Sequence, residues 1–164
     1  MGIFKRSFLE LIGIIIVLVI LLLILNFFMD DYEEDSRIIT AEINDQELFL
    51  EIADNRFLRE IGLSQREFLN ENSGMLFIYD YEIQELTFWM KDTLIPLDIF
   101  FLNKDFEIVY IIKNMEVCKQ DPCPQYTSEK KAKYAIEVNA GWIEKNNIKV
   151  GDTVNFTALD QSES

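Results

Sequence analysis

Residues 7–29 form an almost uninterrupted apolar run, SFLELIGIIIVLVILLLILNFFM, in which Glu10 is the one charged residue. As an α-helix, a run of this length spans roughly 34 Å, which is enough to cross a bilayer core of about 30 Å. A helix satisfies its own backbone hydrogen bonds inside lipid, so the β-branched Ile and Val residues do not count against it. The sequence therefore predicts one transmembrane helix over residues 7–29.

The charges on the two sides of this run predict its orientation. Lys5 and Arg6 precede it, and the acidic sequence DDYEED begins at Asp30. The basic flank of a membrane helix tends to stay in the cytoplasm. We therefore expect a single-pass protein of the cell membrane, with a cytoplasmic N-terminus and an extracytoplasmic C-terminal domain.

Two other interpretations of the apolar run fit the sequence less well. A cleaved signal peptide has a shorter apolar core and a small-x-small cleavage site, whereas Asn26-Phe-Phe-Met29 offers no such site. A helix that binds along a membrane surface has a polar face, which this run lacks. An uncleaved signal anchor is the prediction that remains.

This prediction divides the chain into five parts. They are a cytoplasmic stub (1–6), the anchor (7–29), an acidic linker (30–37), a β domain (38–160) and a short tail (161–164). The part after the anchor has the size of one ordinary domain, and the 13 Phe residues of the chain supply ample core.

Composition excludes several classes of function. Without Lys5, Arg6 and Glu10, the part after the anchor carries 13 basic and 28 acidic residues, and its basic residues form no cluster for a phosphate backbone. Nucleic acid is therefore not expected as a partner. The chain also contains no histidine, which removes Ser–His and Cys–His catalysis and His-ligated zinc. No metal and no cofactor are predicted, and no known catalytic motif is present.

The two cysteines, Cys118 and Cys123, are separated by four residues. Two soft ligands alone support a structural zinc site poorly, and a redox motif has the tighter spacing C-x-x-C. In an extracytoplasmic domain, a local disulfide that closes a proline-containing loop is the default. We predict this disulfide.

Short alternations of apolar and polar residues predict many strands and few helices. The expected strands cover residues 38–43, 48–52, 75–79, 86–91, 97–102, 107–112, 134–139 and 153–159. A short helix capped by Asp54 should end at Gly62, a further helical turn should begin at Ser64, and residues 140–147 should form another short helix. Gly74, Gly141 and Gly151 fall at expected turns. The pattern favours a closed or sandwiched antiparallel β domain with two or three short helices.

Several of these segments resemble one family. They are Arg59–Arg66 (REIGLSQR), Gly74–Phe77 (GMLF), Phe88–Ile99 (FWMKDTLIPLDI), Cys123–Tyr126 (CPQY), Tyr134–Gly141 (YAIEVNAG) and Val150–Asp152 (VGD). The chain resembles the bacterial and archaeal family known as domain of unknown function 192 over about residues 38 to 157. The family usually has Met at the position of Ser64 and Asn at that of Asp92. The resemblance implies a compact, jelly-roll-like β domain, often exported or anchored, and it implies no activity.

Strand alternation predicts two carboxylates on largely apolar faces. Asp98 shares its side of the strand with Phe100 and Leu102, and Glu137 lies between Ile136 and Val138. A carboxylate in such a place must be paired, hydrogen-bonded or protonated. The candidate set, as a structural group of ion pairs or as an anion-binding or acid–base pocket, consists of Arg59, Arg66, Trp89, Lys91, Asp98 and Glu137.

Three functions are compatible with the sequence. We expect a membrane-anchored module that binds a small ligand or an envelope protein, rather than an enzyme. One alternative is a hydrolase or transferase that uses Asp98 and Glu137, and this requires the two carboxylates to face each other across an open cleft. The other alternative is a passive structural component of an envelope complex, which would expose an apolar patch.

Overall fold

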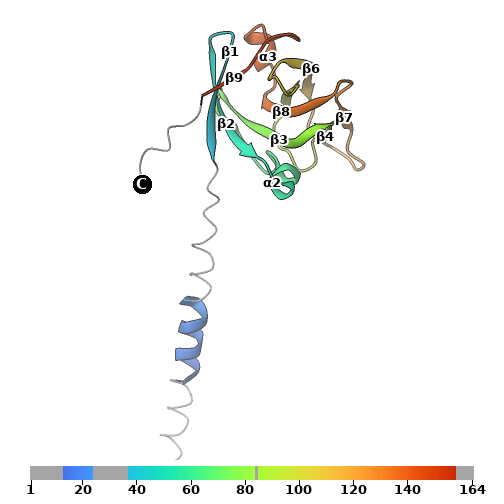
Figure 1. Ribbon diagram of the computed structural model, residues 1–164. Coiled ribbons are helices and arrows are strands. Elements are labelled where there is room, and N and C mark those ends of the chain that lie inside the picture. Colours follow the sequence, from blue (N-terminus) through green and yellow to red (C-terminus); the bar gives the residue numbers. More distant parts are fainter. Residues whose placement is uncertain (1–12, 24–36, 84, 158–164) are drawn as a thin grey trace, which may run out of the picture. The chain divides into compact units, whose positions relative to one another are not determined.

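The computed structural model describes residues 13–23, 37–83 and 85–157. The chain divides into two compact units, Met1–Asp35 and Ser36–Ser164, which are described separately (Figure 1). The second unit contains all the strands named below and two of the three helices among the described residues.

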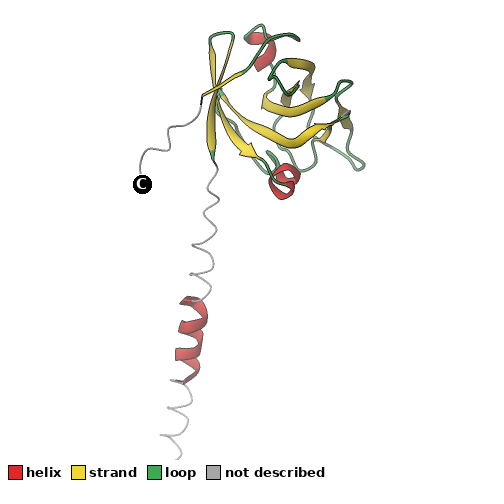
Figure 2. Ribbon diagram, viewed as in Figure 1, coloured by secondary structure: helices red, strands yellow, loops and turns green. Residues whose placement is uncertain are grey.

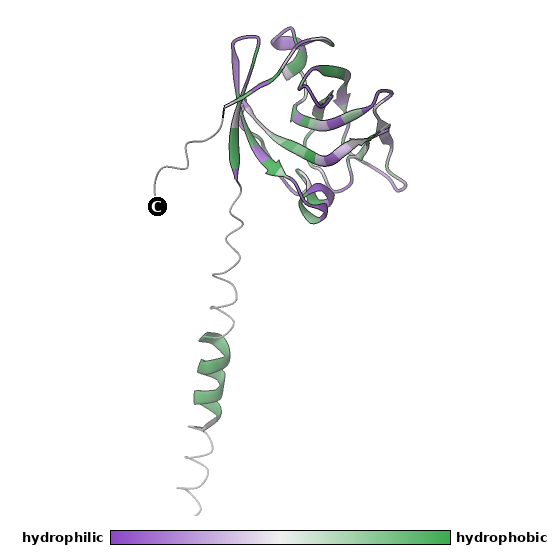
Figure 3. Cartoon of the chain, in the orientation of Figure 1, coloured by the Kyte–Doolittle hydropathy of each residue, from purple (hydrophilic) through white to green (hydrophobic). Residues whose placement is uncertain are grey.

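In the first unit, residues 13–23 form a helix that is apolar along its described length (Figure 3). Its large side chains, from Ile14 to Leu23, are each 49–64% exposed. None of the helices among the described residues is both long and apolar enough to cross a membrane. The predicted span of residues 7–29 extends at both ends beyond the described residues.

The second unit is mainly β, as the sequence predicts (Figure 2). Its strands are β1 (Ile38–Ile43), β2 (Gln46–Ala53), β3 (Ser73–Ile83), β4 (Thr87–Trp89), β5 (Leu97–Leu102), β6 (Ile108–Met115), β7 (Gln125–Thr127), β8 (Ala132–Asn139) and β9 (Asn155–Thr157). Its helices are α2 (Arg56–Ile61) and α3 (Trp142–Lys145).

Seven strands form one sheet in the order β6-β5-β8-β3-β2-β1-β9, and β4 and β7 form a second, two-stranded sheet. The predicted antiparallel arrangement is wrong for one pair, because β2 and β3 run parallel, whereas the other paired strands named here are antiparallel. Parallel neighbours need a long crossover, and here α2 and the loop after it supply one. A bridge between Glu107 and Thr153 joins β6 to the segment before β9, so the sheet curls into a barrel-like ring.

The predicted hairpin at the start of the domain is confirmed. β1 and β2 pair antiparallel, and the turn between them consists of Asn44 and Asp45. Both residues have positive φ, 48° and 61°. Two consecutive residues of this kind make the turn whose twist matches that of a hairpin, and Asn and Asp tolerate the left-handed region well.

α2 confirms a predicted helix but corrects its cap. Asn55, rather than Asp54, caps the helix, with its side-chain oxygen accepting a hydrogen bond from the Leu58 amide at 3.0 Å. The helix ends at Gly62, whose φ of 52° and ψ of −135° suit glycine. The predicted helical turn from Ser64 does not form, because Gln65 has a φ of 61° and its amide donates to the Asp92 carbonyl at 2.8 Å.

The large sheet is buried on both faces, which gives two hydrophobic clusters. The inner cluster includes Leu76, Phe100, Ile136 and Trp142 of α3. The outer cluster lies under the β4–β7 sheet and α2. Its buried members are Ala53, Leu63, Met75, Phe77, Leu86, Phe88, Met90, Leu97, Ile99, Phe101, Met115, Ala132 and Ala135. Successive residues of the central strands alternate between the clusters, so a polar residue on either face of β5 or β8 is buried.

Candidate functional site

Asp98 lies on the inner face of β5 and is fully buried. One carboxylate oxygen accepts a hydrogen bond from the Asn114 amide at 2.8 Å. The other accepts from the amides of Gly141 at 3.0 Å and Ile143 at 3.1 Å. Asp98 was expected to pair with a basic side chain, but its partners are three backbone amides. Asp98 ties the first turn of α3 to the end of β6, which is a structural role.

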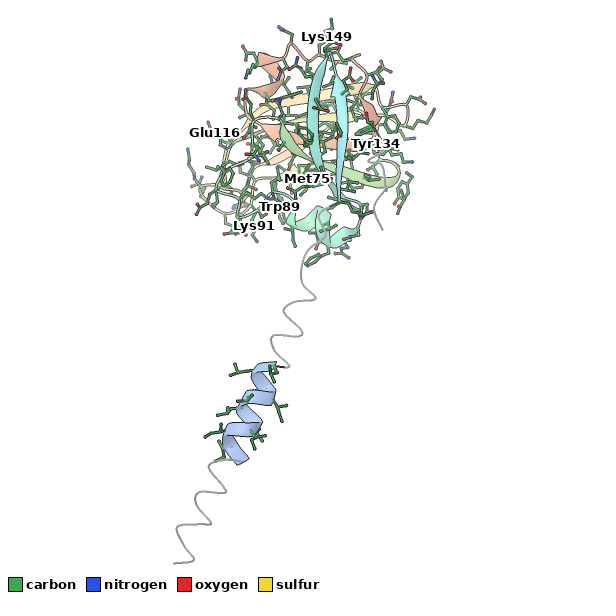
Figure 4. All side chains as sticks on the ribbon, turned by 90° about the vertical axis from the view of Figure 1, so that its left-hand side faces the viewer. Met75, Trp89, Lys91, Glu116, Tyr134 and Lys149 are labelled. Carbon is green, nitrogen blue, oxygen red and sulfur yellow. A yellow bond between two sulfur atoms is a disulfide. The ribbon has the colours of Figure 1, made fainter. Side chains whose placement is uncertain are left out.

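The three basic residues of the candidate set have other partners. Arg66 makes a bidentate ion pair with Glu51 at 2.5 and 2.6 Å. The Lys91 ammonium lies 5.6 Å from the centre of the Trp89 ring, and the two side chains are neighbours in Figure 4. Arg59 donates to the carbonyls of Asp54 at 2.7 Å and Ile78 at 2.8 Å. None of them forms an ion pair with Asp98 or Glu137.

Glu137 lies on the opposite face of the large sheet from Asp98. It belongs to β8, where it pairs with Met75 of β3 on one side and Ile99 of β5 on the other. Its side chain is 4% exposed, and within the described part of the chain it makes no hydrogen bond or ion pair. No fully enclosed side-chain oxygen or nitrogen among the described residues lacks a partner, so the Glu137 oxygens keep some accessible surface. Burial of most of the side chain without a donor is still costly for the charged form.

The Glu137 side chain faces a small cavity between the large sheet, the segment after α2, and β4. The cavity is lined by Arg59, Glu60, Ile61, Gly62, Leu63, Ser64, Phe77, Phe88, Trp89, Thr93 and Glu137. The space in it for water-sized groups is about 30 Å³, about what one or two water molecules need. Glu60 is exposed and Trp89 is 52% exposed, so the cavity reaches the surface.

Burial raises the pKa of Glu137 from 4.5 to about 8, since the apolar surroundings disfavour the charged form. Tyr79 lies nearby on β3. Burial raises the pKa of its phenol, the Arg59 charge lowers it, and the Glu137 charge raises it. The Arg59 guanidinium lies 4.9 Å from the centre of the Tyr79 ring. The cavity thus holds a carboxyl group that is mostly protonated at neutral pH.

The structure brings half of the candidate set together. Arg59, Trp89 and Glu137 line the cavity, whereas Arg66, Lys91 and Asp98 do not. Asp98 and Glu137 share no cleft, so the prediction that they work as a catalytic pair is wrong. Sequence reasoning missed several wall residues, among them Gly62, Ser64 and Thr93. These residues lie in the family-like motifs GLS (62–64) and FWMKDT (88–93), and this was the one feature of the sequence that could have marked them as site residues.

The predicted disulfide is confirmed. Cys118 and Cys123 are bonded, with their Cα atoms 5.4 Å apart, and no free cysteine occurs among the described residues. The bridge closes the loop between β6 and β7, and Cys118 packs against the outer hydrophobic cluster. The described residues contain no group of acidic or cysteine side chains that could hold a metal ion.

The predicted glycine turns are confirmed at three positions. Gly62, Gly141 and Gly151 have φ of 52°, 85° and 96°. Gly74 differs, because its φ is not in the left-handed region. A Cβ there would lie 2.3 Å from the Glu137 carbonyl oxygen, so close approach of β8 explains this glycine.

The domain therefore belongs to a class of small β domain with a mixed, barrel-like sheet. The two-stranded β4–β7 sheet covers one face of it, and the buried acid Glu137 lies on that face. Residues 38–156 match the DUF192 family, described as "Uncharacterized ACR", and the chain belongs to this family. No curated protein matches the chain.

Two solved structures share the fold. A proposed transcription regulator from Sinorhizobium meliloti 1021 is 26% identical, with a TM-score of 0.70, and the match covers 76% of this chain and 97% of that chain. A protein of unknown function from Novosphingobium aromaticivorans DSM 12444 is 25% identical, with a TM-score of 0.67, and the match covers 76% and 89%.

Proposed function

We propose that this chain is a membrane-anchored, extracytoplasmic domain that binds a small ligand in the Glu137 cavity. The observation that carries the proposal is a buried carboxyl group that faces a surface-connected cavity and has no hydrogen-bond partner among the described residues. A carboxyl group whose pKa is strongly perturbed by burial and that lies in a cleft is a candidate for a functional site. The anchor itself rests on the apolar run of residues 7–29 and on the charges that flank it.

Binding is favoured over catalysis by the surroundings of Glu137. A hydrolase that works with two carboxylates needs both of them at one cleft. The second buried carboxylate, Asp98, is on the other face of the sheet and is held by three backbone amides. The description of one structural relative as a transcription regulator does not fit this chain well, because its net charge of −14 opposes binding to nucleic acid.

A second candidate function is binding of an envelope protein, and a different surface favours it. An open hollow of about 500 Å³ lies beside β1 and β2 and includes Ile38, Phe49, Phe68 and Leu69. Phe68 is 75% exposed and Phe49 is 45% exposed. Exposed aromatic side chains of this kind often mark a contact with another protein.

A thermal-shift screen tests the ligand-binding proposal. Full-length chain in a neutral detergent is screened against small polar metabolites, together with Glu137→Gln and the control Glu144→Gln, which removes an exposed carboxylate from α3. We expect compounds that raise the melting temperature of the wild type and of the control but not of Glu137→Gln. Hits that stabilise all three proteins equally, or a screen without hits, would overturn the proposal.

A further inference from the structure

We propose that the Glu137 cavity receives the ammonium head of a primary amine, with the rest of the ligand outside the cavity. This inference rests on the proposed function and names the chemistry of the ligand. Amino acids, polyamines, amino sugars and ethanolamine headgroups all carry such a head, and the cavity would recognise the part that they share.

The first argument is the missing donor. The Glu137 carboxyl group offers up to four acceptor positions when ionised, and no donor among the described residues occupies any of them. A buried carboxylate is stable only when it is paired or accepts hydrogen bonds. An ammonium head provides both a positive charge and three N–H donors.

The second argument is the size of the cavity. The space of about 30 Å³ suits a group about as large as a water molecule, which is the size of an –NH₃⁺ head. A sugar ring or a quaternary ammonium group is several times larger. The cavity therefore selects a small terminal group.

The third argument is the chemistry of the walls. Phe77, Phe88 and Trp89 line the cavity, and Phe77 and Phe88 pack edge to face with ring centres 5.0 Å apart. Aromatic rings attract a cation more than a neutral hydroxyl, so rings beside the carboxyl group favour an ammonium head over an alcohol. The net charge of −14 adds a field that attracts cations to the molecule.

Arg59 also lines the cavity, and its positive charge has to be reconciled with a cationic ligand. Its guanidinium is engaged by two backbone carbonyls and by the ring of Tyr79. The Ile78 carbonyl and the Tyr79 ring belong to β3, and the Asp54 carbonyl lies just before α2. These three contacts fix the guanidinium and offset part of its charge. Among the described residues, the charged or titratable groups near Glu137 include Arg59 and Glu60 of α2, Tyr79 of β3, and Lys91, which lies beside Trp89.

A titration with simple probes tests this inference. Full-length ¹⁵N-labelled chain in a neutral detergent is titrated at pH 8.5 with ethylammonium chloride, ethanol, tetramethylammonium chloride and potassium chloride, and the Trp89 indole signal is followed by NMR. We expect saturable shifts with ethylammonium alone. Glu137→Gln should weaken binding about 10- to 100-fold, the effect of losing a hydrogen bond to a charged group, and Glu144→Gln should leave it unchanged.

The pH dependence provides a second readout. Ethylammonium must displace the proton of Glu137, whose pKa is about 8 in the free protein. Its affinity should therefore rise about tenfold per pH unit from pH 5.5 to 7.5 and level off above about pH 8. Glu137→Gln should abolish this rise.

The outcomes separate the two proposals. Binding of ethanol as tight as that of ethylammonium would overturn the ammonium proposal and leave a ligand cavity in place. Equal ethylammonium affinities for the wild type and Glu137→Gln would also overturn it. Shifts with potassium chloride of the same size would show a salt effect and refute binding. If no probe binds and the thermal-shift screen finds no ligand either, the proposed function fails as well.

Discussion

Two buried acids on neighbouring strands have opposite environments, and the difference follows from their neighbours. Asp98 and Glu137 lie on β5 and β8, one position apart in register. Asp98 receives three backbone amides from two other segments. Glu137 receives no hydrogen bond from the described residues and faces a cavity. The first acid stabilises the fold, whereas the second is held in the apolar layer at a cost in stability.

Replacement of Asp98 should destabilise the domain. In Asp98→Asn, an NH₂ group replaces one carboxylate oxygen. This group is a donor and faces a backbone N–H that is also a donor, so at least one buried N–H loses its acceptor. We expect the free energy of unfolding to fall by about 2–4 kcal/mol. Chemical denaturation measures the change. Asp105→Asn, on an exposed turn, is the control and should stay within about 0.5 kcal/mol of the wild type.

Replacement of Glu137 should have an effect that depends on pH. Below pH 4.5 the carboxyl group is protonated in both the folded and the unfolded chain. Between 4.5 and about 8 the folded chain keeps a proton that the unfolded chain has lost, so stability falls as pH rises. Glu137→Gln removes this loss. From pH 5.0 to 7.5 its stability relative to the wild type should increase by about 3 kcal/mol, and a constant difference would refute the burial of an unpaired acid.

Strand alternation predicted that both acids are buried, but it could not predict their partners. The donors to Asp98 are amides of Asn114, Gly141 and Ile143, which are distant in sequence and carry no side-chain signal. The basic side chains were the natural candidates from sequence, and they pair elsewhere. One cavity brings together Arg59, Trp89 and Glu137, and this depends on the two-stranded sheet of β4 and β7. The pairing of these two short strands could not be predicted from the sequence pattern.

At the scale of elements, two glycines are required for different reasons. Gly74 of β3 lies so close to β8 that a Cβ would meet the Glu137 carbonyl oxygen at 2.3 Å and Leu50 Cδ2 at 2.9 Å. Gly62 ends α2 with positive φ, and a Cβ there would have an ordinary 3.4 Å contact with the Phe77 ring. The first position is limited by packing, and the second is limited by backbone conformation.

This difference predicts an order of stabilities. Gly74→Ala should destabilise by roughly 3 kcal/mol or more, since the backbone of β8 has to move. Gly62→Ala should cost about 1–2 kcal/mol through strain. Gly151→Ala, with positive φ and open space around it, is the matched control for strain alone. Urea midpoints of the three variants check the order, and a Gly74→Ala midpoint no lower than that of Gly151→Ala would contradict it.

Most strands were predictable because both hydrophobic faces require regular alternation or continuous apolar runs. β5, from Leu97 to Leu102, agrees with the prediction at both ends. The parallel pairing of β2 and β3 was not predictable, because hydrophobic alternation is the same in parallel and antiparallel strands. The missing helical turn after Ser64 has a tertiary cause, the hydrogen bond from Gln65 to Asp92.

At the scale of the whole molecule, the proposed anchor predicts a topology. With Cys118 and Cys123 replaced by Ser, a cysteine introduced at the exposed position Glu47 should react with a membrane-impermeant maleimide in intact cells. A cysteine at Gly2 in the same background is the control and should react only after lysis. Protection of the Glu47→Cys variant until lysis would contradict an extracytoplasmic domain.

The central claim is that Glu137 is an unpaired acid in a cavity that reaches the surface, and its ionisation can be measured directly. The side-chain carboxyl carbon of Glu137, assigned by comparison with Glu137→Gln, can be followed by ¹³C NMR as the free full-length protein is titrated from pH 4 to 10. The account predicts a midpoint near 8, because no donor or cation offsets the burial of this group. A midpoint near the ordinary value of 4.5 would contradict it, since the carboxylate would then have a partner or free access to water.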